Sequence, residues 1–376
     1  MKNIMMVLMM MLAALLPASA PGASSISSRS GHTCAINNLA PDSGKLYCWG
    51  SNANCQGSSV CTGRTSYPTP KVTSGVVQVA KNYQGACFIT TTGALKCWGN
   101  NPSGQLGLDP AATPKWPQPI QIFASGMASV AEGWEHVCAV TTGGAVKCWG
   151  NNAHGQLGDG TTTSTWIPVT PIASGALSVA TAGSTSCARM NDNTVKCWGK
   201  DHGNASPAGD QLTPTAVTGL TGVIALGAGD SHFCASSSAL KCWGSNVFGQ
   251  LGDGTTTNRV TPTAVVTLTS GVFGVWGGAQ QTCARKSNNT AWCWGSNNLG
   301  SLGDGTQTDR LTPTQVSGLT GTSLMTVGSD NACSLSTGGY HCWGDGTFRQ
   351  NGPFMDGTWP ADPRLTPFAF YFWGGP

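Results

Sequence analysis

The residues with the most obvious chemistry in this sequence are its 16 cysteines, which occur in pairs. Paired thiols can bind a metal or form disulfides. Zinc sites use two close cysteine pairs, or cysteine with histidine at short spacing, and no such cluster occurs here, so we expect no metal and no cofactor. The local pairs instead predict a disulfide framework, which is typical of exported proteins. The predicted bonds are Cys34–Cys48, Cys55–Cys61, Cys87–Cys97, Cys138–Cys148, Cys187–Cys197, Cys234–Cys242, Cys283–Cys293 and Cys333–Cys342.

Other reactive side chains do not form a recognisable catalytic pattern. Asp159, Asp253 and Asp304 each precede Gly-Thr. Calcium requires several carboxylates at alternate positions, so a single Asp before Gly predicts a turn. His32, His136 and His232 share one position, two residues before a cysteine, and we expect them to be structural. No nucleophile elbow, carboxylate pair or phosphate loop is present, so we expect no enzyme.

The composition is unusually neutral. Only 9% of residues are charged, against about 25% in an average soluble protein. The net charge is +3 and lysine and arginine are not clustered. Nucleic-acid binding requires clustered positive charge, and the sequence therefore argues against a nucleic-acid partner.

The N-terminus has the features of a secretory signal peptide over residues 1–20. Lys2 precedes an apolar run from Ile4 to Leu16, and Ala18-Ser19-Ala20 follows. This run is shorter than the roughly 20 residues of a membrane-spanning helix, so we expect cleavage near Ala20. The mature protein would be secreted, periplasmic or on the cell surface, with no transmembrane span.

A Cys-Trp-Gly motif organises the rest of the chain, because it occurs seven times at spacings of 45 to 51 residues. In the third repeat, residues 128–131, 136–140, 145–150 and 167–172 have strand character, with turns and a Gly-Gln-Leu-Gly loop between them. The copies begin at Cys48, Cys97, Cys148, Cys197, Cys242, Cys293 and Cys342.

Four short strands per repeat, seven times over, predict an all-β, seven-bladed β-propeller over residues 24–376. The first strand is uncharged and made of small or β-branched residues, so we place it innermost. The fourth strand carries Thr-Pro, and proline belongs at a sheet edge. We expect the tail, Arg364 to Phe370, to join the first blade, so that the N- and C-terminal segments close the ring. We also expect the repeated tryptophans to pack between blades.

The third repeat, from His136 to Thr161, strongly resembles the RCC1 (regulator of chromosome condensation) repeat. It carries His-x-Cys-Ala, Lys-Cys-Trp-Gly-Asn-Asn and Gly-Gln-Leu-Gly-Asp-Gly-Thr. Residues 235–255 carry much of the same pattern, and the resemblance extends over residues 24–370. It implies the same propeller fold, and the paired cysteines resemble those of exported bacterial-type members. The founding member exchanges nucleotide on the GTPase Ran and binds chromatin; a signal peptide and the absence of a basic face argue against that role here.

An exported member of this family, a β-lactamase inhibitor, is similar in setting and implies a non-catalytic module that grips a protein with one face. In it, the binding face is built from loops between the first and second strands. The residues at the matching positions vary between repeats while the residues on either side do not. This contrast indicates that the fold does not require particular residues there, so they are free to bind a partner. The alternative is that they are ordinary solvent-exposed loop residues. The matching positions are Tyr83-Gln84, Trp134-Glu135, Ser184-Thr185, Asp230-Ser231, Gln280-Gln281 and Asp330-Asn331.

Two other functions remain open. Trp116, Trp134, Trp166 and Trp276 would suit sugar stacking if they protrude, which favours a carbohydrate- or cell-envelope-binding propeller. A lyase or hydrolase would instead require a deep polar pocket with converging Asp, Glu and His at one end of the central channel. No heptad or oligomerisation helix is present, and we expect a monomer.

Overall fold

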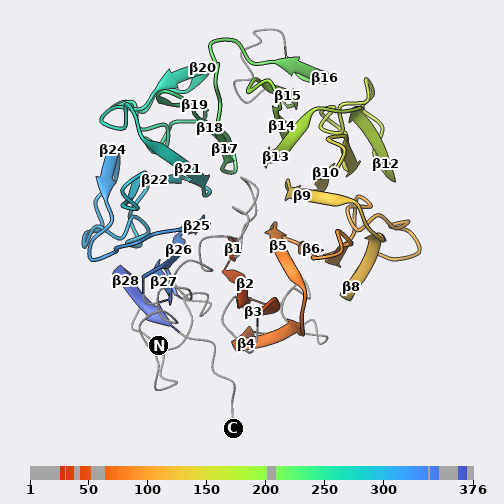
Figure 1. Ribbon diagram of the computed structural model, residues 1–376, viewed down its shortest axis with the longest axis horizontal. Coiled ribbons are helices and arrows are strands. Elements are labelled where there is room, and N and C mark those ends of the chain that lie inside the picture. The colour runs from red at the N-terminus through yellow and green to blue at the C-terminus, as the bar shows by residue number, and fades with distance from the viewer. Residues whose placement is uncertain are drawn as a thin grey trace, which may run out of the picture.

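The computed structural model describes residues 26–29, 31–37, 43–51, 64–200, 209–337, 339–346 and 363–370. These residues form seven four-stranded antiparallel sheets arranged as blades around a central channel (Figure 1), as the repeat predicts. Residues 1–20 and the Cys55–Cys61 pair lie outside the described residues. No helix in the described part of the chain is long and apolar enough to cross a membrane.

Each blade is one uninterrupted segment of the chain. The first three blades comprise β1 (Ile26–Arg29), β2 (His32–Asn37), β3 (Lys45–Ser51) and β4 (Arg64–Val72); β5 (Val76–Lys81), β6 (Gly85–Thr90), β7 (Leu95–Asn100) and β8 (Lys115–Phe123); and β9 (Met127–Glu132), β10 (His136–Thr141), β11 (Val146–Gly150) and β12 (Thr165–Ile172).

The remaining blades follow the same order. They comprise β13 (Ala176–Ala182), β14 (Thr185–Met190), β15 (Val195–Gly199) and β16 (Gln211–Ala216); β17 (Ala225–Ala228), β18 (His232–Ser236), β19 (Leu240–Gly244) and β20 (Arg259–Ala264); β21 (Val272–Gly277), β22 (Gln281–Lys286), β23 (Ala291–Gly295) and β24 (Arg310–Gln315); and β25 (Leu324–Val327), β26 (Asn331–Ser336), β27 (Gly339–Gly344) and β28 (Arg364–Phe370).

The first strand of each blade faces the channel and the Thr-Pro strand lies at the outer edge, as predicted. The expected place of the tail is wrong. Strand β28 pairs with β27 and completes the seventh blade, because every Thr-Pro strand pairs with the Cys-Trp-Gly strand directly before it. The first and seventh blades meet side by side instead: the Ser28 amide donates to Thr326 Oγ1 at 3.1 Å, and Tyr340 donates to the Ile36 carbonyl.

Seven disulfides join directly opposed residues of the second and third strands, one in each blade. In the third blade Cys138 pairs with Cys148 in the strand register, with 4.2 Å between their Cα atoms. The other described bonds are Cys34–Cys48, Cys87–Cys97, Cys187–Cys197, Cys234–Cys242, Cys283–Cys293 and Cys333–Cys342. Each loop closed by a bond is short, so a bond contributes about 2–3 kcal/mol through the entropy of the unfolded chain.

The repeated tryptophan and histidine join neighbouring blades. The Gln156 carbonyl, in the Gly-Gln-Leu-Gly loop of the third blade, accepts from Trp198 Nε1 and from Ser186 Oγ, each at 2.9 Å. His136 Nε2 lies 2.8 Å from Ser186 Oγ. Because the serine proton goes to Gln156, the neutral imidazole donates to Ser186. Burial lowers the pKa of His136 to about 3.

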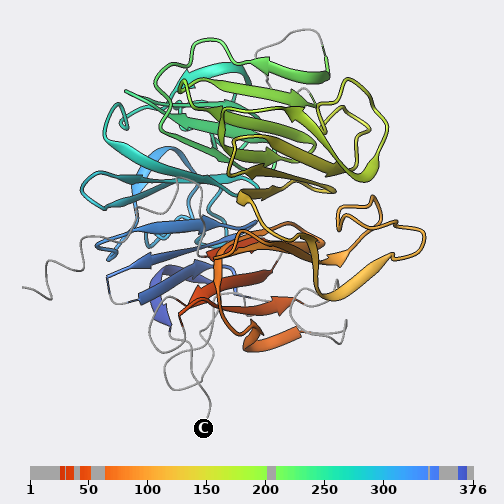
Figure 2. The same cartoon turned by 45° about the vertical axis from the view of Figure 1, so that its right-hand side comes forward.

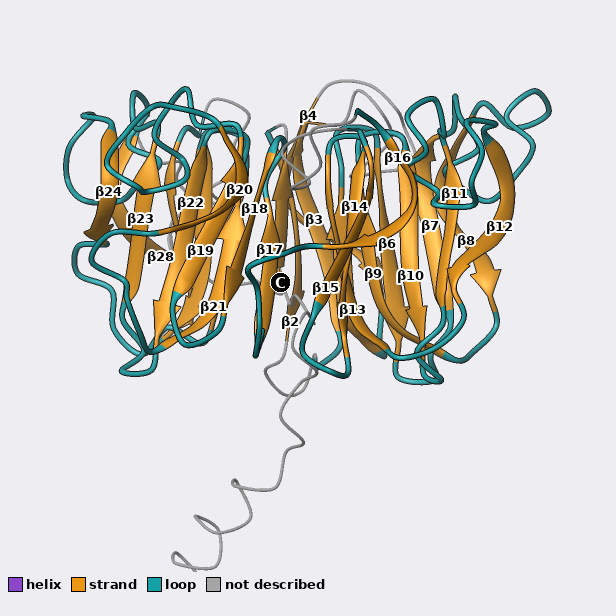
Figure 3. Ribbon diagram, turned by 90° about the horizontal axis from the view of Figure 1, so that it is seen from above, coloured by secondary structure: helices purple, strands orange, loops and turns teal. Residues whose placement is uncertain are grey.

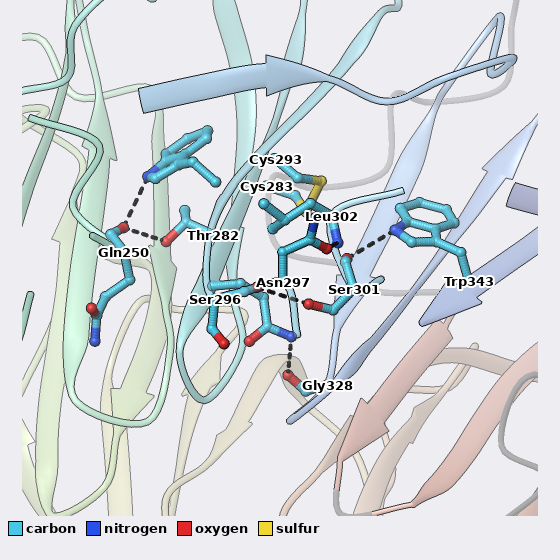
Figure 4. Close-up of a disulfide and its surroundings, with 12 residues drawn as sticks. Gln250, Thr282, Cys283, Cys293, Ser296, Asn297, Ser301, Leu302, Gly328 and Trp343 are labelled. Carbon is cyan, nitrogen blue, oxygen red and sulfur yellow. Dashed lines mark hydrogen bonds between the residues drawn. A yellow bond between two sulfur atoms is a disulfide. The ribbon is translucent and has the colours of Figure 1, made fainter. Parts of the chain in front are cut away.

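The same connection recurs two blades further on (Figure 4), where the Gln250 carbonyl accepts from Thr282 Oγ1 at 2.7 Å and from Trp294 Nε1 at 2.9 Å. His232 Nε2 lies 2.7 Å from Thr282 Oγ1. The seven tryptophans are fully buried, and the structural roles predicted for them and for the repeated histidines are confirmed.

The glycine of Cys-Trp-Gly and the aspartate of the loop serve the backbone. Gly150 has φ of +108°, and a Cβ there would lie 2.5 Å from the Glu135 carbonyl oxygen, so only glycine fits. Asp253 Oδ1 accepts from the amide of Thr255 at 3.0 Å and from its hydroxyl at 2.7 Å. Burial would raise the pKa of Asp253, but hydrogen bonds from Thr255 and Arg259 outweigh burial and lower it. The predicted turn is confirmed.

Candidate functional site

The central channel is a cavity of about 370 Å³ lined mainly by the first strand of every blade. One end, here called the loop side, carries the loops between first and second strands and the Gly-Gln-Leu-Gly loops. The other end, the hairpin side, carries the turns between second and third strands. Figure 3, with the disc seen edge on, shows loops gathered at both ends of the strands, and Figure 2 shows the blades side by side around the ring.

The twelve residues predicted to bind a partner all lie at the loop side, where they divide into two groups. Trp134 is 39% exposed. Seven others are partly exposed: Tyr83, Gln84, Glu135, Ser184, Ser231, Gln280 and Asp330. These eight residues are the predicted ones that reach the surface of the loop side.

Thr185, Gln281 and Asn331 are instead buried, and the expectation that they are loop residues is wrong. Each is the first residue of a second strand and pairs with the Cys-Trp-Gly glycine of its blade. Thr185 Oγ1 donates to the Lys200 carbonyl at 2.7 Å, and Gln281 Nε2 donates to the Gly328 carbonyl at 3.2 Å. Ser28 Oγ donates to Asn331 Oδ1 at 3.1 Å. All three therefore have structural roles.

A chain of polar contacts holds the loop side rigid around Trp134. Glu135 Oε2 accepts from Ser103 Oγ at 2.9 Å and from Asn151 Nδ2 at 3.1 Å. Gln84 Nε2 lies 3.4 Å from Glu135 Oε1. The Trp134 amide donates to the Gly183 carbonyl at 3.0 Å, and the indole lies over Gly183, where a Cβ would come within 3.5 Å of the ring. The exposed indole is thus held in place by its neighbours.

Polar side chains from the first, second and fifth blades meet at the loop side of the channel. Arg29 Nη2 lies 2.9 Å from Asp230 Oδ1, and both side chains are buried. The Tyr83 hydroxyl donates to the same carboxylate, and the Arg29 guanidinium lies 5.9 Å from the Tyr83 ring centroid. Burial, and then the charge of Asp230, raise the pKa of Tyr83 to about 12. Asp230 is therefore a buried structural partner of Arg29, not a free surface residue.

Two more buried charged residues, Lys81 and Glu132, come from adjacent blades and line the same channel. Lys81 Nζ donates to the Asn82 carbonyl at 3.1 Å, and Glu132 Oε1 has no hydrogen-bond partner among the described residues. Burial lowers the pKa of Lys81 to about 7, against the effect of Glu132. Burial likewise raises the pKa of Glu132 to about 8, against the effect of Lys81. The channel is thus deep and polar, and Glu132 lines it. His32, His136 and His232 are buried among the blades and do not line the channel, so no described histidine joins Glu132 and Lys81 there.

The four tryptophans considered for sugar stacking do not share one surface. Trp116 and Trp166 are 44% and 40% exposed on the outer strands β8 and β12. Trp276 does not protrude, which corrects the expectation. It lines the channel, and its ring lies so close to Gly274 that a Cβ there would come within 2.4 Å.

Sequence reasoning overlooked the charged residues that line the channel. Lys81 and Glu132 end first strands, at a position where β13, β17 and β21 carry Thr181, Ala228 and Gly277. A position-by-position comparison of the seven repeats would have found them, because charge at a buried strand position departs from the pattern. The arginines at 189 and 285 carry the same signal.

Comparison with known proteins identifies the repeat. Models of the Regulator of chromosome condensation (RCC1) repeat match residues 76–105, 128–156, 93–140, 144–188, 242–285 and 288–344, which together exceed half of the chain. The E3 ubiquitin-protein ligase HERC2 of Homo sapiens is 29% identical over 350 residues, covering 87% of this chain and 7% of that protein. The ultraviolet-B receptor UVR8 of Arabidopsis thaliana is 29% identical over 64% of this chain and 46% of its own length. The chain thus spans less than half of these relatives.

Solved structures share the architecture. Human WBSCR16 superposes with a TM-score of 0.73 at 20% identity, over 84% of this chain and 87% of that one. Prp20p of Saccharomyces cerevisiae, whose binding to Gsp1p and histones is described with its structure, gives 0.73 at 18% identity, over 86% and 85%. At these identities the likeness concerns the fold. Since the repeat models cover more than half of the sequence, this chain belongs to the RCC1-repeat family.

Proposed function

We propose that this chain is an exported, non-catalytic propeller that binds another protein through its loop side. The observation that carries the proposal is Trp134, a large aromatic side chain that is 39% exposed and held by Gly183 and its own backbone. Aromatic anchors held in advance contribute much of the energy of protein interfaces. The polar residues Gln84 and Glu135 would form the rim.

Two further observations support parts of this proposal. Seven disulfides among the described residues are typical of an oxidising compartment, which supports export. The structure of Prp20p, which has the same fold, is described together with its binding to Gsp1p and histones, which supports protein binding as a use of such a propeller.

The test is capture of secreted and envelope proteins on the immobilised mature chain, with three matched baits. The baits are the wild type, Trp134→Ala and Trp166→Ala. The two variants each remove one indole of similar exposure, but Trp166 lies on the outer strand β12 against Gly104, at the rim of the disc and not beside the channel. We expect one protein to be retained saturably, lost with Trp134→Ala and kept with Trp166→Ala. Equal retention by all three baits would contradict the proposal.

Carbohydrate binding is the second candidate, and the exposed Trp116 and Trp166 on neighbouring outer strands favour it. Aromatic rings can stack on sugars, and such binding is lost to soluble competitor. Retention on insoluble envelope polysaccharide that soluble sugar competes away, and that Trp166→Ala removes, would support this candidate over the first.

A further inference from the structure

Two arginines occupy a position that the fold otherwise fills with uncharged residues. In each blade the second residue after the second-strand cysteine pairs with the third strand and faces the interior. Arg189 and Arg285 stand there in the fourth and sixth blades. In the other blades the position carries Ile36, Ile89, Val140, Ser236 and Leu335. The other five blades therefore show that the fold does not require arginine at this position.

Small residues on the first strand let both side chains reach the channel. Arg189 is opposite Ser178, and Arg285 is opposite Gly274. Both arginines line the central cavity, at its hairpin side, since they lie near the ends of β14 and β22 that lead into the hairpin turns. At Gly274 the place of a side chain is taken by the Trp276 ring, which also lines the cavity.

Neither guanidinium is neutralised within the described part of the chain. Arg189 is 5% exposed, and its Nη1 reaches the Val223 carbonyl only at 3.5 Å. Arg285 Nη1 lies 3.4 Å from Asn289 Oδ1. The Nε atoms of both arginines are buried without a hydrogen-bond partner, and no described carboxylate lies within salt-bridge distance of either. Burial lowers the pKa of both groups.

Arg189 is buried and Arg285 is half-buried. An unpaired charge taken out of water costs free energy, so its presence at a position that tolerates isoleucine indicates an external counter-charge. One exposed apolar side chain lines the same cavity: Phe273, which is 55% exposed.

We propose that the hairpin side of the channel binds a small organic anion, with its oxyanion head at Arg189 and Arg285 and its apolar body against Phe273. The cavity of about 370 Å³ falls in the range of small-molecule sites. A free carboxylate such as a medium-chain fatty acid and the carboxylate at the end of an apolar peptide share this chemistry. The site is separate from the loop side and does not depend on Trp134.

Titration calorimetry on the full mature chain tests this, with sodium octanoate, octanol, acetate and the dipeptide N-acetyl-Leu-Phe as probes. We expect octanoate or the dipeptide to bind saturably. Octanol lacks the carboxylate and acetate lacks the apolar body, so both should bind far more weakly. Tighter binding of octanoate assigns the site to free acids, and tighter binding of the dipeptide assigns it to peptide ends. Absence of saturable binding by both would overturn the proposal.

Variants locate the site. Arg189→Gln and Arg285→Gln should each weaken binding about tenfold or more, the loss expected for one charged hydrogen-bond donor. Phe273→Ala should weaken octanoate binding, whereas Arg310→Gln, which removes a surface arginine paired with Asp304, should not change it.

Thermal unfolding checks that each variant folds. Arg285 is less buried than Arg189, so Arg285→Gln keeps the test valid if Arg189→Gln misfolds. Unchanged affinity in Arg285→Gln would contradict the proposal, and Trp134→Ala should leave the affinity unaltered.

Discussion

The two ends of the central channel treat buried charge in opposite ways. At the loop side, Arg29 contacts Asp230 at 2.9 Å, and the charges of Lys81 and Glu132 partly counteract the effect of burial on one another without forming a salt bridge. At the hairpin side, Arg189 and Arg285 have no acidic partner among the described residues. The Arg29–Asp230 pair links two distant blades, and removing one partner would leave the other charge buried, whereas an unpaired buried charge costs stability until a ligand binds. The difference separates residues that maintain the fold from residues that are available for binding.

The largest effect is expected from breaking the loop-side pair. Asp230→Ala leaves the Arg29 guanidinium buried without its partner and removes the acceptor of Tyr83. We expect a loss of about 3–5 kcal/mol in the free energy of unfolding, measured by urea denaturation. A loss under about 1 kcal/mol would show that this pair behaves like a surface ion pair, and the contrast between the two ends would fail.

Acidification lowers stability because the buried histidines stay neutral inside the ring while the unfolded chain takes up protons. Burial lowers the pKa of His136 to about 3, and burial lowers that of His232 to about 4, with Asp230 opposing and Arg29 adding to the effect. The unfolded chain binds protons near pH 6.5, so stability is complete above that pH and falls below it. At pH 5 each histidine should cost about 2 kcal/mol. Urea denaturation at pH 7.5 and pH 5 measures this, and His136→Gln should reduce the difference by about 2 kcal/mol; an unreduced difference would assign it to other groups.

At the hairpin side the sign should reverse. Arg189→Met replaces an unpaired buried cation with an apolar side chain of similar length, at a position where other blades carry Ile89 or Val140. We expect the free energy of unfolding to rise by about 1 kcal/mol. A decrease of the same size would mean that the guanidinium supports the fold through its contact with Val223.

The smallest effect is expected at the exposed indole. Trp134→Ala should change the free energy of unfolding by about 0.5 kcal/mol or less, although it removes the proposed anchor. Trp198→Ala, which deletes a fully buried indole and its hydrogen bond to Gln156, should cost about 3–5 kcal/mol. Comparable losses in the two variants would place Trp134 among the residues that maintain the blade packing.

The architecture could be predicted because its causes are repeated in the sequence. The Cys-Trp-Gly motif recurs seven times. Its cysteine forms the cross-strand disulfide, its tryptophan supplies the buried ring, and its glycine allows the positive φ. The position of β28 was not predictable from the strand count alone, because an outer strand can complete its own blade or the first one. Pairing of Cys342 with Phe368 decides for its own blade.

The binding surface was predicted less well because the positions chosen in different blades lie at different distances from the following cysteine. Thr185 and Gln281 were counted as loop residues, although the position of the following cysteine aligns them with the structural His136. Arg189 and Arg285 were missed for another reason. In the sequence, Cys-Ala-Arg differs from Cys-Ala-Val by a single residue. Only the three-dimensional structure shows that no described carboxylate lies near the arginine.

Because every blade begins and ends within its own stretch of chain, no strand is exchanged across the junction between the first and seventh blades. Contacts such as that from Ser28 to Thr326 close the circle through side chains. A gene for such a protein can therefore be cut and rejoined between any two blades, or lengthened by copying one whole unit, without any strand having to find a new partner.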